Sequence, residues 1–127
     1  MMRLDILYIS ESEGKGRGVF TKESIDPETI VEIAPVIVMD SVHRGMLDQT
    51  PLHDYIFEWG DDRKSCAMAL GWVPIYNHDI ESNCEYFMDF EDATMFIKTI
   101  RKVHAGEELC VNYHGDSGDG RPVWFEL

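Results

Sequence analysis

The residues best suited to ligand chemistry lie in a glycine-rich segment near the N-terminus, residues 14–20 (GKGRGVF). Gly16 and Gly18 have no Cβ atom, and at such positions a backbone can approach a ligand closely. Lys15 and Arg17 stand beside these glycines, so the segment could hold a carboxylate electrostatically. The spacing is not the G-x-G-x-x-G of a dinucleotide-binding turn, and no long helix follows it.

Other groups with catalytic or metal-binding potential are less well arranged. Glu107 and Glu108 invite comparison with the paired carboxylates that divide acid and base roles in some enzymes. Exposed acids in a turn are usually solvated, so we do not interpret them as such a pair. The thiols and imidazoles lack the short spacings of structural zinc, and we predict no metal site. They are Cys66, His78, Cys84, His104, Cys110 and His114.

Three separated segments, taken in order, are unlike a generic β-protein: residues 14–20, residues 76–86 (YNHDIESNCEY) and residues 106–116 (GEELCVNYHGD). The first resembles the opening motif of the SET domain. The second resembles its asparagine–histidine motif followed by an Asn-Cys element, and the third its Gly-Glu-Glu-Leu-x-x-x-Tyr signature. The chain therefore resembles a SET-domain protein-lysine methyltransferase, over nearly its whole length. Residues 52–70 strengthen the resemblance to the minimal viral and bacterial SET proteins.

The resemblance implies transfer of a methyl group from S-adenosylmethionine to the ε-amine of a lysine, which leaves S-adenosylhomocysteine and needs no metal. Lysine has a reference pKa of about 10.4, so the enzyme must admit its neutral form. A tyrosine ring excludes water from the lysine channel, and its protonated hydroxyl can orient the amine. By motif position we expect Tyr113 to be the catalytic tyrosine, with Tyr86 and Tyr55 as further channel tyrosines. Without the motifs, all three would be interpreted as half-buried strand aromatics.

The resemblance also implies which residues contact the cofactor. In the family, the adenine lies against the segment that corresponds to Asn77 and His78, and the asparagine amide holds the amino-acid end. Asp79 replaces the family's usual serine, which puts the local hydrogen bonding in question. The expected cofactor-binding residues are Lys15, Gly16, Arg17, Gly18, Asn77, His78, Tyr113 and Trp124.

The C-terminal segment is a candidate lid. Many SET enzymes carry a cysteine cluster after the catalytic tyrosine, but this chain does not, so another segment must close the channel. Trp124 and Phe125 would be costly to leave in water. We hypothesise that residues 116–127 fold back over the cofactor or the lysine channel. Core packing or a dimer contact is the alternative.

The elements that must position these residues are mostly short strands separated by turn signals. We predict a mostly β fold with little helix. The resemblance implies the SET-domain (β-clip) fold of several small sheets with a C-terminal pseudoknot. We predict a strand at residues 3–9 that leads into a glycine-rich turn at 10–18, and a strand at 30–39 that is bent, or lies at a sheet edge, near Pro35. One or two helical turns should follow an N-cap at Ser41. Two hairpins are predicted, one from strands at 55–59 and 65–70 and the other from strands at 85–90 and 94–101.

Composition limits the class of protein and its partners. A chain of 127 residues predicts one domain, residues 1–127. A net charge of −13 argues against direct nucleic-acid binding and favours a basic protein or peptide, such as a histone-like tail. Three cysteines and the lack of a membrane-length apolar stretch predict a reduced, soluble protein. We expect a cytoplasmic location, or a nuclear one for a eukaryotic or viral source, and a homodimer like the small viral relatives.

Two classes of function remain open at this stage. The first is a lysine methyltransferase acting on a basic protein; a free amine as substrate would differ only in the acceptor. The second is a SET-like module that binds peptide or cofactor without turnover, as the Asp79 replacement would allow. The presence of all three channel tyrosines favours the enzyme.

Overall fold

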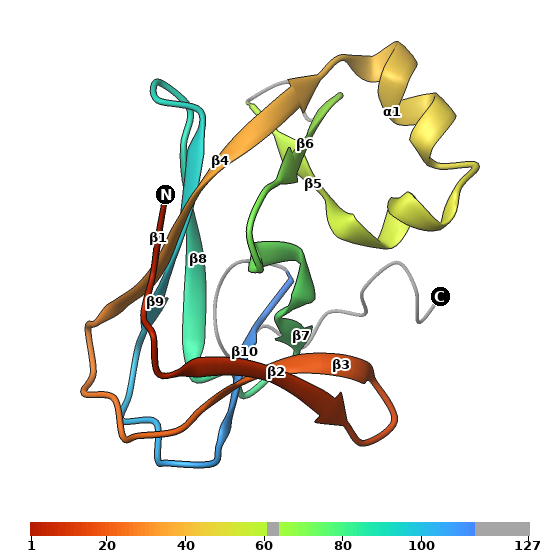
Figure 1. Ribbon diagram of the computed structural model, residues 1–127. Helices are drawn as coiled ribbons and strands as arrows, with labels where there is room; N and C mark the ends of the chain where they lie inside the picture. Colours follow the sequence, from red (N-terminus) through yellow and green to blue (C-terminus); the bar gives the residue numbers. More distant parts are fainter. Residues whose placement is uncertain (61–63, 114–127) are drawn as a thin grey trace.

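Strands dominate the part of the chain that the computed structural model describes, residues 1–60 and 64–113 (Figure 1). The mostly β fold with little helix is thereby confirmed. The elements in chain order are β1 (Met2–Arg3), β2 (Leu7–Ser12), β3 (Gly16–Thr21), β4 (Ile30–Met39), α1 (Ser41–Leu47), the 3-10 helix η1 (Pro51–Tyr55), β5 (Ile56–Trp59), β6 (Ser65–Ala69), the 3-10 helix η2 (Val73–Ile75), β7 (Asn77–His78), β8 (Cys84–Asp89), β9 (Thr94–Thr99) and β10 (Glu108–Val111).

The long strand β4 organises the larger sheet, whose order is β5-β6-β4-β9-β8 with β1 added to β4. Its first half pairs with β9 and its second half with β6. Pro35 stands at the change of partner and cannot donate a backbone hydrogen bond, so a ladder cannot continue unchanged through it. The predicted bend near Pro35 is where one strand passes from one partner to the other.

The two predicted hairpins are confirmed as β5–β6 and β8–β9, and no strand end differs from its predicted position by more than two residues. The glycine-rich segment differs from its prediction. β2 continues to Ser12 and β3 begins at Gly16, so the turn contains only residues 13–15. Gly16 and Gly18 are therefore strand residues that pair with Ser12 and Ser10, although Gly16 retains a positive φ of 76° beside the turn.

The short helix is confirmed, but its cap is one residue earlier than predicted. The Asp40 carboxylate accepts a hydrogen bond from the His43 backbone N–H at 3.0 Å, and Ser41 is the first helical residue. The helix ends at Leu47, before Pro51, which opens the 3-10 helix η1 behind a Thr50 cap.

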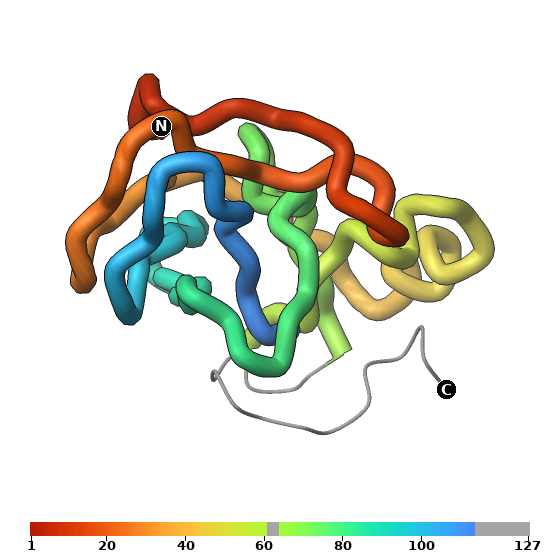
Figure 2. The backbone as a smooth tube through the Cα atoms, turned by 90° about the horizontal axis from the view of Figure 1, so that it is seen from below, coloured from red at the N-terminus to blue at the C-terminus, as the bar shows by residue number. Residues whose placement is uncertain are grey.

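The smaller sheet has the order β2-β3-β10-β7 and carries the three motifs. β10 pairs antiparallel with β3 and parallel with β7, with Cys110 opposite Asn77. Figure 2 shows β10, in blue, lying between the β2–β3 hairpin and the green bend of residues 76–84. Asp79 ties this bend to β10, because its N–H donates to the Val111 carbonyl oxygen at 3.0 Å. The second and third motifs thus meet on one sheet.

The core lies where the two sheets meet, and it is made mainly of β-branched and sulfur-containing side chains. Its fully buried members include Val19, Val31, Tyr76, Met95, Ile97, Leu109 and Val111. Within the described ranges, no helix is long and apolar enough to cross a membrane.

Candidate active site

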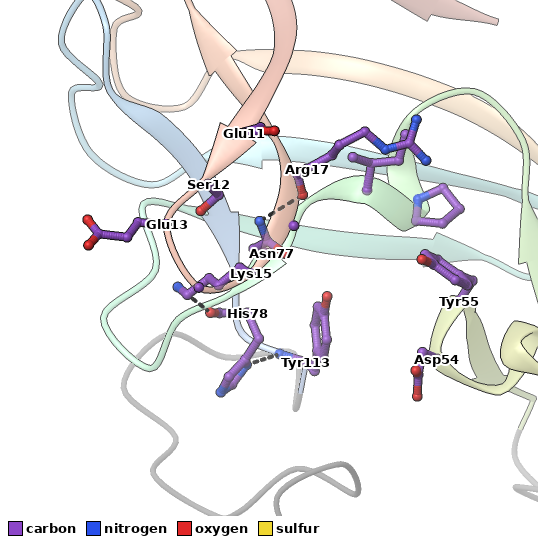
Figure 3. A pocket seen from close by; sticks show the side chains of 14 residues that line it. Glu11, Ser12, Glu13, Lys15, Arg17, Asp54, Tyr55, Asn77, His78 and Tyr113 are labelled. Atoms are coloured by element: carbon purple, nitrogen blue, oxygen red, sulfur yellow. Dashed lines mark hydrogen bonds between the residues drawn. The ribbon is translucent and has the colours of Figure 1, made fainter.

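A cavity of about 1050 Å³ opens beside the smaller sheet. Residues from five elements of the chain line it (Figure 3). These are residues 11–17 of the β2–β3 hairpin, Asp54 and Tyr55 at the end of η1, Pro74 and Ile75 of η2, and Asn77, His78 and Tyr113 from β7 and the end of β10. Of the predicted site residues, Lys15, Gly16, Arg17, Tyr55, Asn77, His78 and Tyr113 therefore lie at one cavity.

Three hydrogen bonds fix the backbone and the side chain of Tyr113. Its hydroxyl donates to the Tyr76 backbone carbonyl oxygen at 3.0 Å. Its backbone N–H donates to His78 Nδ1 at 3.0 Å, and its carbonyl oxygen accepts from the Tyr86 hydroxyl at 3.0 Å. Burial, reinforced by neighbouring acidic groups, raises the pKa of the Tyr113 hydroxyl to about 12. The hydroxyl is therefore a protonated donor throughout the physiological pH range.

A second and much smaller hollow adjoins the cavity at Tyr113. Its volume is about 10 Å³, room for about one water molecule. Ile56 and Phe57 line it together with four residues that also line the large cavity: Asp54, Tyr55, Pro74 and Tyr113. The large cavity and this narrow, aromatic-walled space thus meet at Tyr55 and Tyr113.

Tyr86, expected to be a channel tyrosine, occupies a different position. It is not among the residues that line either hollow, and its ring packs on Phe57 with centroids 5.3 Å apart. Its hydroxyl contacts the backbone of Tyr113. Tyr86 therefore contacts Tyr113 directly, and its role as a channel tyrosine stays a prediction.

The glycine-rich hairpin brings its cations to the cavity. Lys15 Nζ donates to the His78 carbonyl oxygen at 3.2 Å, and the Arg17 carbonyl oxygen accepts from Asn77 Nδ2 at 3.0 Å (Figure 3). Gly18 is buried and is not one of the lining residues. A Cβ atom there would collide with the side chains of Glu108 and Asn77, so the missing Cβ makes room for protein groups.

Asp79, which stands where the family usually has serine, has a local role. Its carboxylate accepts the Glu81 backbone N–H at 2.9 Å, which closes a turn after β7. Because Asp79 is exposed and is not among the lining residues, the replacement does not put a carboxylate into the cavity wall.

The adjacent acids are structural, but they are not solvated turn residues as the sequence suggested. Partial burial opposes ionisation of Glu107, yet hydrogen bonds from the His104 N–H, Asn83 and Arg101 leave its pKa below the ordinary value. Glu108 lies on β10 and accepts from Ser12 Oγ at 2.6 Å and Asn77 Nδ2 at 2.8 Å.

Two residues that shape the site were missed in the sequence. Glu32 lies fully buried on β4, and its carboxylate accepts a hydrogen bond from the Tyr76 hydroxyl. The backbone carbonyl oxygen of Tyr76 in turn accepts a hydrogen bond from the Tyr113 hydroxyl. The sequence contained a signal for Glu32, namely an acidic residue inside the apolar run IVEIAPVIVM. An acid in such a run is buried with it, and a buried carboxylate needs hydrogen-bond partners. Ser12 gave no comparable signal. The predicted contact Trp124 and the proposed lid at 116–127 lie outside the described residues.

Among residues 1–60 and 64–113, no group of three or more His, Cys, Asp or Glu side chains is placed to hold a metal ion. The donors at the cavity are an ammonium, a guanidinium, amides and hydroxyls. Such a set suits an organic ligand with charged and polar ends.

Comparison with known proteins agrees with this fold. The family model of the SET domain matches residues 16–114. The chain is 33% identical over 121 residues, 94% of its own length and 77% of the relative's, to a Schizosaccharomyces pombe histone-lysine N-methyltransferase specific for H3 lysine-37. A crystal structure of a Plasmodium falciparum protein described as a histone methyltransferase shares the fold, with a TM-score of 0.65 and 23% identity over 87% of this chain and 98% of that one. The protein belongs to the SET-domain family of protein-lysine methyltransferases.

Proposed function

We propose that this protein methylates a lysine side chain of a basic protein, such as a histone or histone-like protein, with S-adenosylmethionine as methyl donor. The observation that carries the proposal is the position of Tyr113, whose protonated hydroxyl stands where the large cavity meets the narrow hollow. The relative from Schizosaccharomyces pombe, named for lysine methylation of histone H3, supports the same substrate class.

The residues of the large cavity fit the proposed cofactor. Its volume is comparable with the upper end of the roughly 300–1,000 Å³ typical of small-molecule sites. Lys15 and Arg17 would meet the carboxylate, while the amide of Asn77 would meet the polar amino-acid end. When bound, the cofactor supplies a methyl group on a sulfonium cation, so the reaction needs no covalent intermediate with the protein.

The hydroxyl oxygen of Tyr113 would orient the incoming amine by accepting a hydrogen bond from it through a lone pair. The proton of its hydroxyl is engaged with the Tyr76 carbonyl oxygen, so the hydroxyl oxygen can still accept a hydrogen bond from an amine N–H or a weak one from a polarised methyl group. The rings of Tyr55 and Tyr113, which line the large cavity, would pack along the aliphatic stem of lysine and exclude water. A lysine held in this way has to be neutral, which the apolar walls favour.

The charge of the protein favours a basic substrate. The chain has a net charge of −13, and Asp54 lines both the cavity and the narrow hollow. Glu11 and Glu13 are exposed carboxylates on the hairpin side of the cavity. Such a rim would attract a Lys- and Arg-rich segment over a Debye length of about 10 Å. Homodimerisation stays a prediction, which light scattering at micromolar concentration would test.

The decisive experiment combines calorimetric titration with S-adenosylmethionine and mass spectrometry of mixed basic proteins. We expect cofactor binding and mass gains in steps of one methyl group. Tyr113→Phe should bind the cofactor but methylate roughly 10²-fold more slowly, a typical cost of losing one positioned polar group.

Tyr8→Phe is a matched control, because Tyr8 packs on Phe20 in the β2–β3 hairpin and is not among the cavity residues. It should retain wild-type rates. Cofactor binding without any methyl gain would instead favour a module that binds without turnover.

A further inference from the structure

A polar cluster at the cavity wall joins four strands. The Glu108 carboxylate on β10 accepts from Ser12 Oγ on β2 at 2.6 Å and from Asn77 Nδ2 on β7 at 2.8 Å. Asn77 Nδ2 also donates to the Arg17 carbonyl oxygen on β3 at 3.0 Å (Figure 3). Ser12 and Asn77 both line the cavity, whereas Glu108 is not one of the lining residues.

These contacts determine which way the Asn77 amide faces. An asparagine amide has a donor NH2 and an acceptor oxygen, which coordinates alone rarely distinguish. Here both neighbours of the nitrogen, a carboxylate and a backbone carbonyl, can only accept. The two NH2 protons are thus both used, and the amide oxygen is the polar atom that Asn77 can offer to a ligand.

Gly18 is an independent sign that the space is built for this cluster. A Cβ atom at Gly18 would collide with a Glu108 carboxylate oxygen and lie 2.9 Å from Asn77 Nδ2. The backbone of β3 therefore approaches the two side chains as closely as only glycine allows.

We propose that Glu108 is a positioning residue that turns the acceptor oxygen of Asn77 toward the cavity and thereby selects ligands that carry an ammonium group. Lys15 and Arg17 lie on the same cavity and complement a carboxylate. The site as a whole would then recognise an amino-acid end, an ammonium next to a carboxylate. This inference rests on the proposed function, because it specifies how the cavity proposed to bind the cofactor recognises its ligand.

Calorimetry with two ligands tests the idea. S-adenosylhomocysteine has the amino-acid end, and 5′-methylthioadenosine keeps the nucleoside and the thioether without it. Glu108→Ala should weaken S-adenosylhomocysteine binding about tenfold, as expected for one lost charge-assisted contact, and change 5′-methylthioadenosine binding by less than about twofold. Ser12→Ala, which removes one anchor of Glu108, should give a smaller loss of the same kind.

The conservative variant Glu108→Gln separates positioning from charge. Its side-chain oxygen can still accept from Asn77, and its NH2 group can donate to Ser12, so near wild-type binding is expected. Glu91→Ala is the matched control, because it removes an exposed carboxylate from the turn between β8 and β9, and Glu91 is not among the residues that line the cavity. It should leave the preference between the two ligands unchanged.

Several results would overturn the inference. A loss in Glu108→Gln as large as in Glu108→Ala would mean that the charge matters and the amide orientation does not. Equal losses for both ligands would indicate general damage to the cavity. The losses from Asn77→Ala and Glu108→Ala should not add in the double variant; full additivity would show that Glu108 does not act through Asn77. A wild-type protein that binds neither ligand would instead refute the proposed function.

Discussion

The carboxylate of Glu32 accepts a hydrogen bond from the hydroxyl of Tyr76 at 2.9 Å, inside the core and 44 residues away in sequence. Its other oxygen accepts the backbone N–H of Trp72 at 2.7 Å. Glu32 thus holds both ends of the segment from Trp72 to Tyr76, and the carbonyl oxygen of Tyr76 in turn receives the Tyr113 hydroxyl. A buried acid on β4 is therefore connected to the candidate catalytic tyrosine through one intervening residue.

The first prediction concerns pH and Glu32. Burial raises the pKa of this carboxyl above its ordinary value of 4.5, although the hydrogen bonds from Trp72 and Tyr76 oppose the rise. A raised folded-state pKa contributes stability that is complete below the unfolded-state pKa and is lost as the pH rises through the folded-state pKa. Relative to Glu32→Gln, the wild type should gain free energy of unfolding as the pH falls from neutrality toward 4.5. Urea denaturation across this range measures the gain, and a constant difference would contradict it.

Gly71→Ala should destabilise the protein by about 1–2 kcal/mol, because Gly71 has a φ of 69° in the left-handed region. The added Cβ would also lie 2.5 Å from a carboxylate oxygen of Glu32. Gly45→Ala provides the opposite control: Gly45 lies within α1 and has open space around it, so alanine should stabilise by about 0.5–1 kcal/mol. Thermal or urea unfolding measures the free energy of unfolding of both variants. An unchanged free energy of unfolding in Gly71→Ala would contradict the prediction.

Tyr86→Phe tests whether the Tyr86 hydroxyl acts in the channel itself or only by contacting Tyr113. The variant loses one hydrogen bond to the Tyr113 carbonyl oxygen, so the free energy of unfolding should fall by about 1 kcal/mol. Methyl transfer should slow less than in Tyr113→Phe, with cofactor affinity unchanged. If Tyr86→Phe is the more damaging of the two variants in single-turnover assays, its hydroxyl itself faces the reacting groups.

The pH dependence of methyl transfer should follow the substrate. Because the pKa of Tyr113 is raised to about 12, its hydroxyl stays protonated while a lysine with a reference pKa of about 10.4 loses its proton. We expect kcat/KM to rise from about pH 7 to about pH 10 without a descending limb from tyrosine ionisation. Tyr113→Phe should show the same slope at a lower rate. A falling limb present in the wild type and absent from the variant would contradict this assignment.

The three thiols should be unreactive in the folded protein. Cys66, Cys84 and Cys110 are free and buried, and burial raises the pKa of each thiol, that of Cys110 to about 12. The reactive thiolate is therefore scarce near pH 8. A thiol-specific chromogenic reagent should label the native protein slowly and all three thiols after unfolding in urea. Rapid labelling of the native protein would show that one of them is accessible.

Local sequence determined much of this protein. Alternation of apolar residues and turn residues predicted the hairpins that became β5–β6 and β8–β9, because these pairs are close in the chain and depend on local turn chemistry. The motif tyrosines and the cations Lys15 and Arg17 were also found from sequence, since their types and spacing resemble a known family. Tyr55, Tyr113 and both cations do line one cavity.

Tertiary structure alone decided how the parts act on one another. The parallel pairing of β7 with β10 brings Asn77 and Glu108 together across 31 residues, and the burial of β4 makes Glu32 a partner of Tyr76. Hydrogen bonds between residues distant in sequence depend on strand register and burial, which residue types and spacing do not specify. For that reason Glu108 was interpreted as a turn residue, although it lies on β10 and accepts a hydrogen bond from Asn77. Tyr86 and Gly18 are not among the residues that line the cavity, and their roles at the channel and the cofactor stay predictions.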